Sequence, residues 1–345
     1  GTTGTPKGAL TSHHNLINNA AMIGRYCNIN SQSITLLATQ FCHMSGIIGG
    51  IVMSLLKGQK TVIASPVYDS IKVLEAIIKE KCTNLITIPP LCADMIEKSK
   101  LHNLRPTTLE VVTYGGAPCS EQLAMDLKET FNIKSLVQVY GMTEMGVTFI
   151  SRPEDTLEQR TKYVGKVGDH LEVKVVDREG LIVPMGTPGE LWVRGYSIML
   201  EYWNDEEKTQ EFMQHNRWAR TGDQFVLQED GYGCIVGRIK DCIIRLGDKI
   251  FSSEIEEFFT QHLDVIEAQA FGVPDPKVGE EICVYLRLRE GAVLTEDYIR
   301  NYCKDKLPEY RIPRYIRFTK EFPRTAVGKV TKYKLLEELK KELAI

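Results

Sequence analysis

The chain has 345 residues, of which 43% are hydrophobic, 25% charged and 8% aromatic. This composition supports a buried core and excludes disordered, collagen-like and low-complexity proteins, and at roughly 150 residues per domain the length predicts two or three domains. The 42 basic and 45 acidic side chains give a formal net charge of −3, so no overall positive field favours nucleic acid or an anionic membrane as a partner.

The first 150 residues alternate short apolar runs with helical periodicity. Ile71, Leu74, Ile77 and Ile78, for example, recur at helical spacing and predict one buried helix face. The alternation is typical of βαβ units, so we expect an α/β region with a doubly wound sheet and ligands at the strand ends. The expected strands are 61–64, 85–88, 109–113 and 136–139, and the expected helices are 70–82 and 121–131.

Two further regions follow. In residues 160–237 helical patterns become scarce and Gly and Pro become dense, which predicts a compact β subdomain. Beyond it, the sequence predicts a small α+β domain over 242–345. Its expected elements are a helix starting over 253–260, strands at 265–273 and 282–288, two more helices, and a C-terminal helix rich in Lys and Glu.

The cysteines and the apolar stretches bear on the cellular compartment. Nine widely spaced cysteines contain no C-x-x-C pair, which predicts reduced, mostly packed thiols. The most apolar stretch, 44–56, is shorter than the roughly 20 residues of a membrane-spanning helix and is interrupted by glycines. We therefore expect no transmembrane helix.

The opening octapeptide combines glycines, hydroxyls and a lysine, which suits a loop that wraps phosphate oxygens. It is not a Walker A loop, because Pro6 and Gly8 flank Lys7 where that motif requires Gly and Ser or Thr. A flexible, turn-rich terminus is the alternative. The candidate phosphate-binding residues are Gly1, Thr2, Thr3, Gly4, Thr5, Pro6, Lys7 and Gly8.

Five later segments are informative because of both their residues and their order along the chain. They are Tyr114-Gly115-Gly116-Ala117-Pro118, Tyr140-Gly141-Met142-Thr143-Glu144, Arg220-Thr221-Gly222-Asp223, Gly237-Arg238-Ile239-Lys240-Asp241 and Gly328-Lys329. Together with the opening loop, they resemble the adenylate-forming (AMP-binding) superfamily over the whole chain. Within it, the chain is most similar to the acyl-CoA synthetases of the medium-chain type.

The resemblance implies an acid-thiol ligase of fatty acid metabolism that forms AMP. Such enzymes use ATP and Mg²⁺ to convert a carboxylate to an acyl adenylate, and coenzyme A then attacks that adenylate. The implied fold is part of a doubly wound N-terminal domain with a β subdomain (1–237), a hinge (238–241) and a mobile C-terminal α+β domain (242–345).

The resemblance also assigns roles to residues around the nucleotide. Thr2, Thr3, Gly4 and Lys7 would hold the triphosphate. Thr143 would contact phosphate and Glu144 would bind Mg²⁺ as a hard oxygen donor. The other implied nucleotide contacts are Gly115, Gly116 and Ala117 for adenine, Tyr140 and Gly141 beside them, and Asp223 and Arg238 for ribose. The alternatives are a solvated loop carboxylate for Glu144, a Gly-Asp turn for Asp223 and a surface ion pair for Arg238.

Three positions in the C-terminal part complete the implied machinery. Lys329 matches the catalytic lysine, whose ammonium would bridge the substrate carboxylate and the α-phosphate; the alternative is a solvated basic helix face. Lys240 matches the hinge, although an ordinary surface turn explains the Lys240-Asp241 pair equally well. Gly247 matches the coenzyme A face, where Leu246 replaces a second Gly common in relatives.

The segment around His43 and Gly46 matches the wall of the acyl pocket. It contains no carboxylate for an amino group, so an amino-acid substrate is disfavoured and an aliphatic acid is favoured. A packed structural histidine is the alternative for His43. A ligase for an aryl carboxylate and a truncated, non-catalytic nucleotide-binding remnant remain open as functions.

Relatives carry a further stretch before the phosphate loop, so we expect this chain to be part of a longer enzyme. A transit peptide would lie in that stretch. A mitochondrial location therefore follows from the resemblance alone, with the cytoplasm as the alternative.

Overall fold

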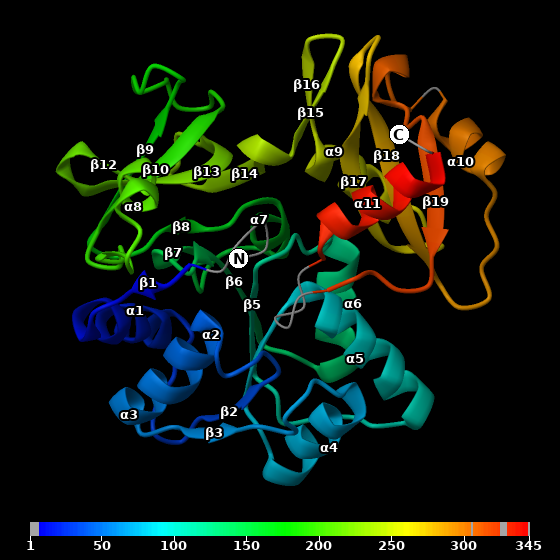
Figure 1. The fold of residues 1–345 in the computed structure, drawn as a ribbon. Helices are drawn as coiled ribbons and strands as arrows, with labels where there is room; N and C mark the ends of the chain where they lie inside the picture. The colour runs from blue at the N-terminus through cyan, green and yellow to red at the C-terminus, as the bar shows by residue number, and fades with distance from the viewer. Residues whose placement is uncertain (1–6, 305, 325–329, 344–345) are drawn as a thin grey trace. The chain divides into compact units, whose positions relative to one another are not determined.

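The computed structural model describes residues 7–304, 306–324 and 330–343. The chain divides into two compact units (Figure 1). The large unit contains 7–221 and 226–235, and the small unit contains 222–225 and the described residues from 236 onward.

A seven-stranded sheet forms the centre of the large unit, in the order β3-β2-β4-β5-β6-β7-β8. The first five strands of this order are parallel to one another. Strand β7 is antiparallel to both of its neighbours, β6 and β8. The strands are β2 (Ile34–Leu37), β3 (Lys60–Val62), β4 (Asn84–Thr87), β5 (Val111–Gly115), β6 (Ser135–Met142), β7 (Gly146–Ile150) and β8 (Lys166–Val167). Because parallel strands end at one edge, the loops after β5 and β6 lie next to each other.

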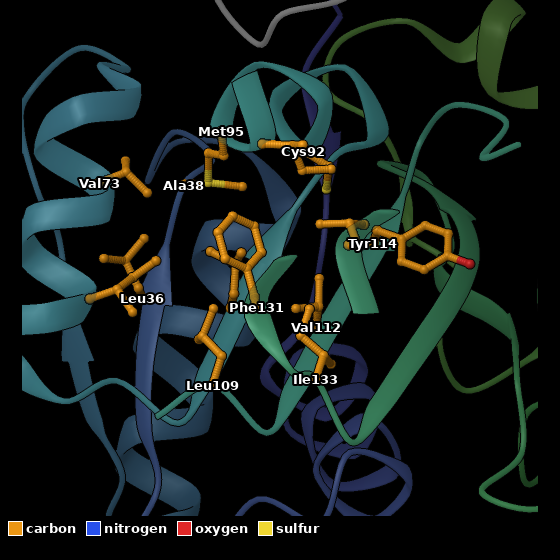
Figure 2. Close-up of a cluster of buried hydrophobic side chains, with 14 of the residues drawn as sticks. Leu36, Ala38, Val73, Cys92, Met95, Leu109, Val112, Tyr114, Phe131 and Ile133 are labelled. Carbon is orange, nitrogen blue, oxygen red and sulfur yellow. The ribbon is translucent and has the colours of Figure 1, made fainter. Parts of the chain in front are cut away.

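Helices cover both faces of this sheet. On one face α4 (Ser70–Glu80), α5 (Pro89–His102) and α6 (Glu121–Phe131) enclose the core shown in Figure 2, in which Leu36, Val112 and Phe131 meet. On the other face α1 (His13–Tyr26) and the consecutive α2 (Met44–Gly46), η1 (Ile47–Val52) and α3 (Met53–Lys57) pack on Val137 and Ile150. The predicted doubly wound arrangement is therefore confirmed.

Local signals explain the helix limits. Ser120 caps α6 by accepting from the Leu123 amide at 3.2 Å, and Asn132 ends the helix with φ 51°. Asp69 caps α4, and Lys81 ends it with φ 54°. One predicted side chain is misplaced, because Ile78 is 41% exposed and the face buried on the sheet is formed by Val73, Leu74 and Ile77.

The β subdomain is confirmed as a five-stranded sheet in the order β12-β13-β10-β9, with β14 beside β13. A separate pair joins β1 (Ala9–Leu10) to β11 (Glu201–Tyr202) in antiparallel fashion. The other elements are α7 (Leu157–Lys162), β9 (Leu171–Val176), β10 (Gly189–Gly195), α8 (Glu206–Phe212), β12 (Met213–Gln214), η2 (His215–Arg217), β13 (Trp218–Leu227) and β14 (Gly233–Arg238).

The small unit is an α+β fold, as predicted. Its sheet has the order β16-β15-β18-β17, with β19 parallel to β18, and Phe259 and Ile282 lie in its core. The elements are η3 (Ile239–Asp241), β15 (Cys242–Arg245), β16 (Asp248–Phe251), α9 (Ser252–Thr260), β17 (Val265–Asp275), β18 (Gly279–Leu288), α10 (Glu296–Cys303), η4 (Glu309–Arg311), β19 (Tyr315–Thr319) and α11 (Lys332–Leu343). Of the two middle helices predicted, the second is only the 3₁₀ turn at 309–311.

The structure also bears on the predictions about the cysteines and about membrane-spanning helices. All nine cysteines lie in the described part of the chain and none of them forms a disulfide there, and six of them are buried. Across residues 7–304, 306–324 and 330–343, no helix combines the length and apolarity that crossing a bilayer requires.

Candidate functional site

Two glycine turns lie at the carboxyl ends of β5 and β6. Gly115 is the last residue of β5, and a Cβ there would lie 2.4 Å from the carbonyl oxygen of Val139 on β6. Gly116 follows with φ 77° and is exposed, while Ala117 is partly exposed. The missing side chain at Gly115 allows the backbones of β5 and β6 to approach closely, and the exposed Gly116 follows at the strand end.

The turn between β6 and β7 contains Thr143 and Glu144. Tyr140 is buried on β6, and Gly141 has no room for a side chain, because a Cβ there would lie 2.0 Å from the Gly146 carbonyl oxygen. The Met145 amide donates to the Met142 carbonyl at 3.1 Å, which closes the turn. Thr143 is exposed and Glu144 partly exposed, so their polar groups can meet a ligand.

Glu144 is fixed at both its backbone and its side chain. Its carbonyl oxygen accepts a hydrogen bond from the Met199 amide at 2.8 Å. Its carboxylate oxygen Oε1 accepts one from the hydroxyl of Tyr202 at 2.6 Å. Burial, followed by the hydrogen bond and the charge of Glu144, holds the pKa of Tyr202 well above its ordinary value. The phenol therefore remains a proton donor to Glu144 at physiological pH.

The end of the opening loop meets the same tyrosine. Residues 1–6 lie outside the described residues, but Lys7 and Gly8 lie within them. The Lys7 ammonium is 4.4 Å from the centre of the Tyr202 ring, and the Gly8 carbonyl oxygen accepts from the Trp203 amide at 2.7 Å. Lys7 and Glu144, which are far apart in sequence, thus share Tyr202, a residue that the sequence analysis did not select.

The predicted acyl-pocket residues form a compact turn. The Ser45 amide donates to Nδ1 of His43 at 3.2 Å, so His43 caps α2, and the Ser45 hydroxyl lies 2.8 Å from the same nitrogen. Gly46 is buried, and a Cβ there would lie 2.5 Å from the Gln40 carbonyl oxygen. His43 therefore has a local structural role while its ring remains partly exposed.

In the small unit, Asp223 and Arg238 form an ion pair. Arg238 Nε lies 3.1 Å from Asp223 Oδ1. Asp223 is only 5% exposed, whereas the Arg238 side chain is about one-third exposed at 37%. The two predicted ribose-binding residues are therefore brought together.

The remaining predicted residues of the small unit lie in turns or outside the described residues. Lys240 lies in the exposed η3 turn. Gly247, with φ 87°, and Leu246, with φ 55°, form the two-residue turn between β15 and β16. Lys329 lies outside the described residues. Its described flanks are joined, because Arg324 and Val330 form an antiparallel bridge and the Thr331 amide donates to the Pro323 carbonyl at 2.8 Å.

Comparison with known proteins identifies the family. Residues 1–203 match the family of AMP-binding enzymes, and residues 254–329 match the AMP-binding enzyme C-terminal domain. The chain therefore belongs to the AMP-binding enzymes, as its motifs indicated.

Within this family, the chain is similar to a curated acyl-CoA ligase. The chain is 40% identical over 349 residues to the medium-chain acyl-CoA ligase ACSF2, mitochondrial, of Bos taurus, in an alignment covering 99% of this chain and 57% of the relative. It thus spans little more than half the length of that relative.

Two solved structures share the fold. The anthranilate CoA ligase AuaEII in complex with anthranoyl-AMP matches with a TM-score of 0.90 and 26% identity, over 100% of this chain and 67% of that one. The ATP-bound MatB from Rhodopseudomonas palustris matches with a TM-score of 0.89 and 25% identity, over 99% and 67%.

Proposed function

We propose that this chain is part of an ATP-dependent ligase that activates a medium-chain fatty acid as an acyl adenylate and transfers the acyl group to coenzyme A. The observation that supports this most is the 40% identity to a medium-chain acyl-CoA ligase across nearly the whole chain. The strand-end turns supply groups suited to the first half-reaction, which requires positioned phosphates and neutralised charge.

In this proposal the phosphates of ATP lie between the opening loop and the turn after β6. Residues 1–8 wrap the triphosphate, and Thr143 donates a hydrogen bond to phosphate. Tyr140 and Gly141 shape the strand end from which this turn projects.

Glu144 is proposed to hold Mg²⁺, whose charge neutralises the phosphates. Its carboxylate is a hard oxygen donor, and Oε2 has no hydrogen-bond partner among the described residues. No cluster of three or more His, Cys, Asp or Glu suited to a metal occurs in the described ranges. This fits Mg²⁺, which is commonly held by one or two carboxylates together with substrate phosphates and water.

The adenosine part of ATP has its own candidate contacts. Adenine packs on the backbone of Gly115, Gly116 and Ala117, of which Gly116 is exposed and the other two are partly exposed. The buried carboxylate of Asp223 accepts hydrogen bonds from the ribose hydroxyls, and Arg238 both orients that carboxylate at 3.1 Å and offers further donors.

The C-terminal part is assigned a role in both half-reactions. We place the domain limits at 1–237 and 242–345, with a hinge at 238–241 in which Lys240 changes its backbone angles. Lys329 stabilises charge during adenylation. Gly247 then leaves space for the coenzyme A thiol, which is consistent with the absence of any other described atom within 4 Å of a Cβ built there.

We also propose that His43 and Gly46 form part of the pocket that binds the acyl chain.

A second candidate function, a ligase for an aryl carboxylate, is favoured by the fold shared with a ligase bound to anthranoyl-AMP. A non-catalytic nucleotide-binding remnant is the third reading. We also propose a mitochondrial location, because the curated relative is named as mitochondrial.

The test is exchange of labelled pyrophosphate into ATP by the purified full-length protein, in the presence of saturated acids of graded chain length or of benzoate and anthranilate. We expect exchange that depends on the acid, is greatest with a medium-chain acid and is lost in Lys329→Ala. Greater exchange with the aryl acids would support the second function. Nucleotide binding without pyrophosphate exchange, whichever acid is added, would support the non-catalytic nucleotide-binding remnant.

A further inference from the structure

Tyr202 lies where three parts of the large unit meet, and it is 5% exposed. It belongs to β11, which pairs with β1 at the end of the opening loop, with Ala9 opposite Tyr202. Its hydroxyl reaches the turn after β6, where it donates to Glu144 Oε1. The Lys7 ammonium lies 4.4 Å from the centre of its ring. One side chain thus contacts both the candidate phosphate loop and the candidate metal ligand.

The surroundings hold Tyr202 in place. Its amide donates to the Thr209 hydroxyl at 2.9 Å, and that hydroxyl donates to the Asp205 carbonyl oxygen at 2.8 Å. Asp205 caps α8, and Phe212 from the same helix meets the Tyr202 ring edge-on with centroids 6.0 Å apart. Few rotamers of Tyr202 are compatible with this packing, so the hydroxyl is a fixed donor.

A fixed donor on one carboxylate oxygen has a definite consequence for metal binding. It sets the rotation of the Glu144 carboxylate and occupies Oε1, which leaves Oε2 directed elsewhere for a cation or its water. Hydrogen bonds of this kind behind a metal-binding carboxylate typically change metal affinity or activity by about 10- to 100-fold when removed.

We propose that Tyr202 is a positioning residue of the adenylation site, which orients Glu144 for Mg²⁺ and holds the Lys7 ammonium beside it until the triphosphate arrives. This inference rests on the proposed function, since it assigns Glu144 to the metal. The attraction between an exposed ammonium and an aromatic ring is weak, so phosphate oxygens can draw Lys7 away from the ring. Lys7 is exposed, so it is able to leave the ring.

The test compares Tyr202→Phe with Tyr196→Phe in the full-length protein. The first variant removes the donor but keeps the ring beneath Lys7. The second removes a hydroxyl that contacts the Met22 sulfur at 3.6 Å and the Asn19 side chain, rather than Glu144, and serves as the matched control. Acid-dependent pyrophosphate exchange is measured against free Mg²⁺ concentration, with thermal unfolding as a check on folding.

We expect Tyr202→Phe to raise the Mg²⁺ concentration for half-maximal exchange about 10-fold, with near-normal exchange at saturating Mg²⁺. Tyr196→Phe should match the unchanged protein. The proposal is overturned if the Mg²⁺ curves coincide, or if Tyr202→Phe lowers exchange equally at every Mg²⁺ concentration, which is the behaviour of a purely structural residue.

A second measurement separates this proposal from the proposed function and remains informative if exchange is weak. Mg²⁺-dependent ATP binding is compared in Glu144→Gln and in the double variant with Tyr202→Phe. If Tyr202 acts through Glu144, the second substitution adds no further shift, whereas independent additive shifts overturn the proposal. Absence of exchange in the unchanged protein would count against the ligase function, while the binding cycle would still decide the role of Tyr202.

Discussion

Gly141 lies against the backbone of Gly146 in the β6–β7 hairpin, where a Cβ atom on Gly141 would lie 2.0 Å from the Gly146 carbonyl oxygen. Gly141 itself pairs with Val147, and Gly146 pairs with Met142. The obstacle is backbone, so a larger residue can be accommodated only if the hairpin itself shifts. That hairpin carries Thr143 and Glu144, and the glycine therefore determines where both polar groups lie.

Gly141→Ala is expected to displace this turn. Overpacking of this kind lowers the free energy of unfolding by about 1–3 kcal/mol. A misplacement of about 1 Å in a catalytic group can reduce the rate about 100-fold, so pyrophosphate exchange should fall by that order. Gly186→Ala is the control for a glycine replacement without steric overlap, because no other described atom lies within 4 Å of a Cβ built there. Its cost is the backbone strain of an alanine at φ 81°, and exchange should be retained. Equal losses of exchange in the two variants would contradict the steric argument.

Asp223→Asn tests the ribose contact. The substitution keeps the shape of a buried side chain but removes its charge and replaces one acceptor with a donor. ATP affinity should fall about 10-fold, since hydrogen bonds to charged groups contribute about 1.5–3 kcal/mol. The unchanged protein should prefer ATP to 2′-deoxy-ATP, and the variant should lose most of that preference. Asp69→Asn, at the N-cap of α4, is the control and should leave both affinities unchanged. A preserved preference in Asp223→Asn would exclude the assignment.

The thiols should differ sharply in reactivity. Cys42 is exposed, whereas burial raises the pKa of Cys27 to about 11 and that of Cys119 to about 12. The reactive species is the thiolate, so buried thiols with raised pKa values remain protonated and inert near pH 8. Titration with a chromogenic disulfide should show one fast thiol, which Cys42→Ser removes, and six thiols that react only after unfolding. A fast phase that survives in Cys42→Ser would contradict the burial pattern.

Leu246→Asn should stabilise the small unit. Leu246 has φ 55° and is 65% exposed. Its backbone is therefore held in a left-handed conformation, and its side chain buries too little apolar surface to offset the strain. A branched side chain in that conformation costs about 1–2 kcal/mol, whereas Asn-Gly is the favoured pair for a two-residue hairpin turn. We expect a gain of about 0.5–1 kcal/mol in urea unfolding. Leu263→Asn, at a position that is 84% exposed and is not among the residues with positive φ, should give no gain. Equal effects of the two changes would remove the conformational explanation.

The sequence predicted best those elements whose signals are local. The helix at Glu121–Phe131 has a serine cap, a clear apolar face and an asparagine end, and its predicted limits match. Helix α1 was not predicted, because its buried face includes Asn15 and Asn19, whose amides bond to backbone carbonyls of Ile198 and Val147. Such polar groups are satisfied only in the folded chain, so hydropathy gives no sign of the burial.

The same distinction applies to the candidate site. The glycine turns and Glu144 were selected because each belongs to a short motif at a strand end. Tyr202 was not selected, since its relation to Glu144 joins residues 58 positions apart and depends on the pairing of β1 with β11. No spacing rule connects those positions, and only the fold brings them together.

The most direct test of the proposed function is isolation of the acyl adenylate. The full-length protein is incubated with octanoate, ATP and Mg²⁺ without coenzyme A, quenched in acid and analysed by mass spectrometry, and coenzyme A is then added to a parallel sample. We expect octanoyl-AMP with equimolar pyrophosphate, followed by conversion to octanoyl-CoA and AMP when coenzyme A is present. Formation of octanoyl-CoA with release of ADP and phosphate, and with no adenylate at any time, would contradict it.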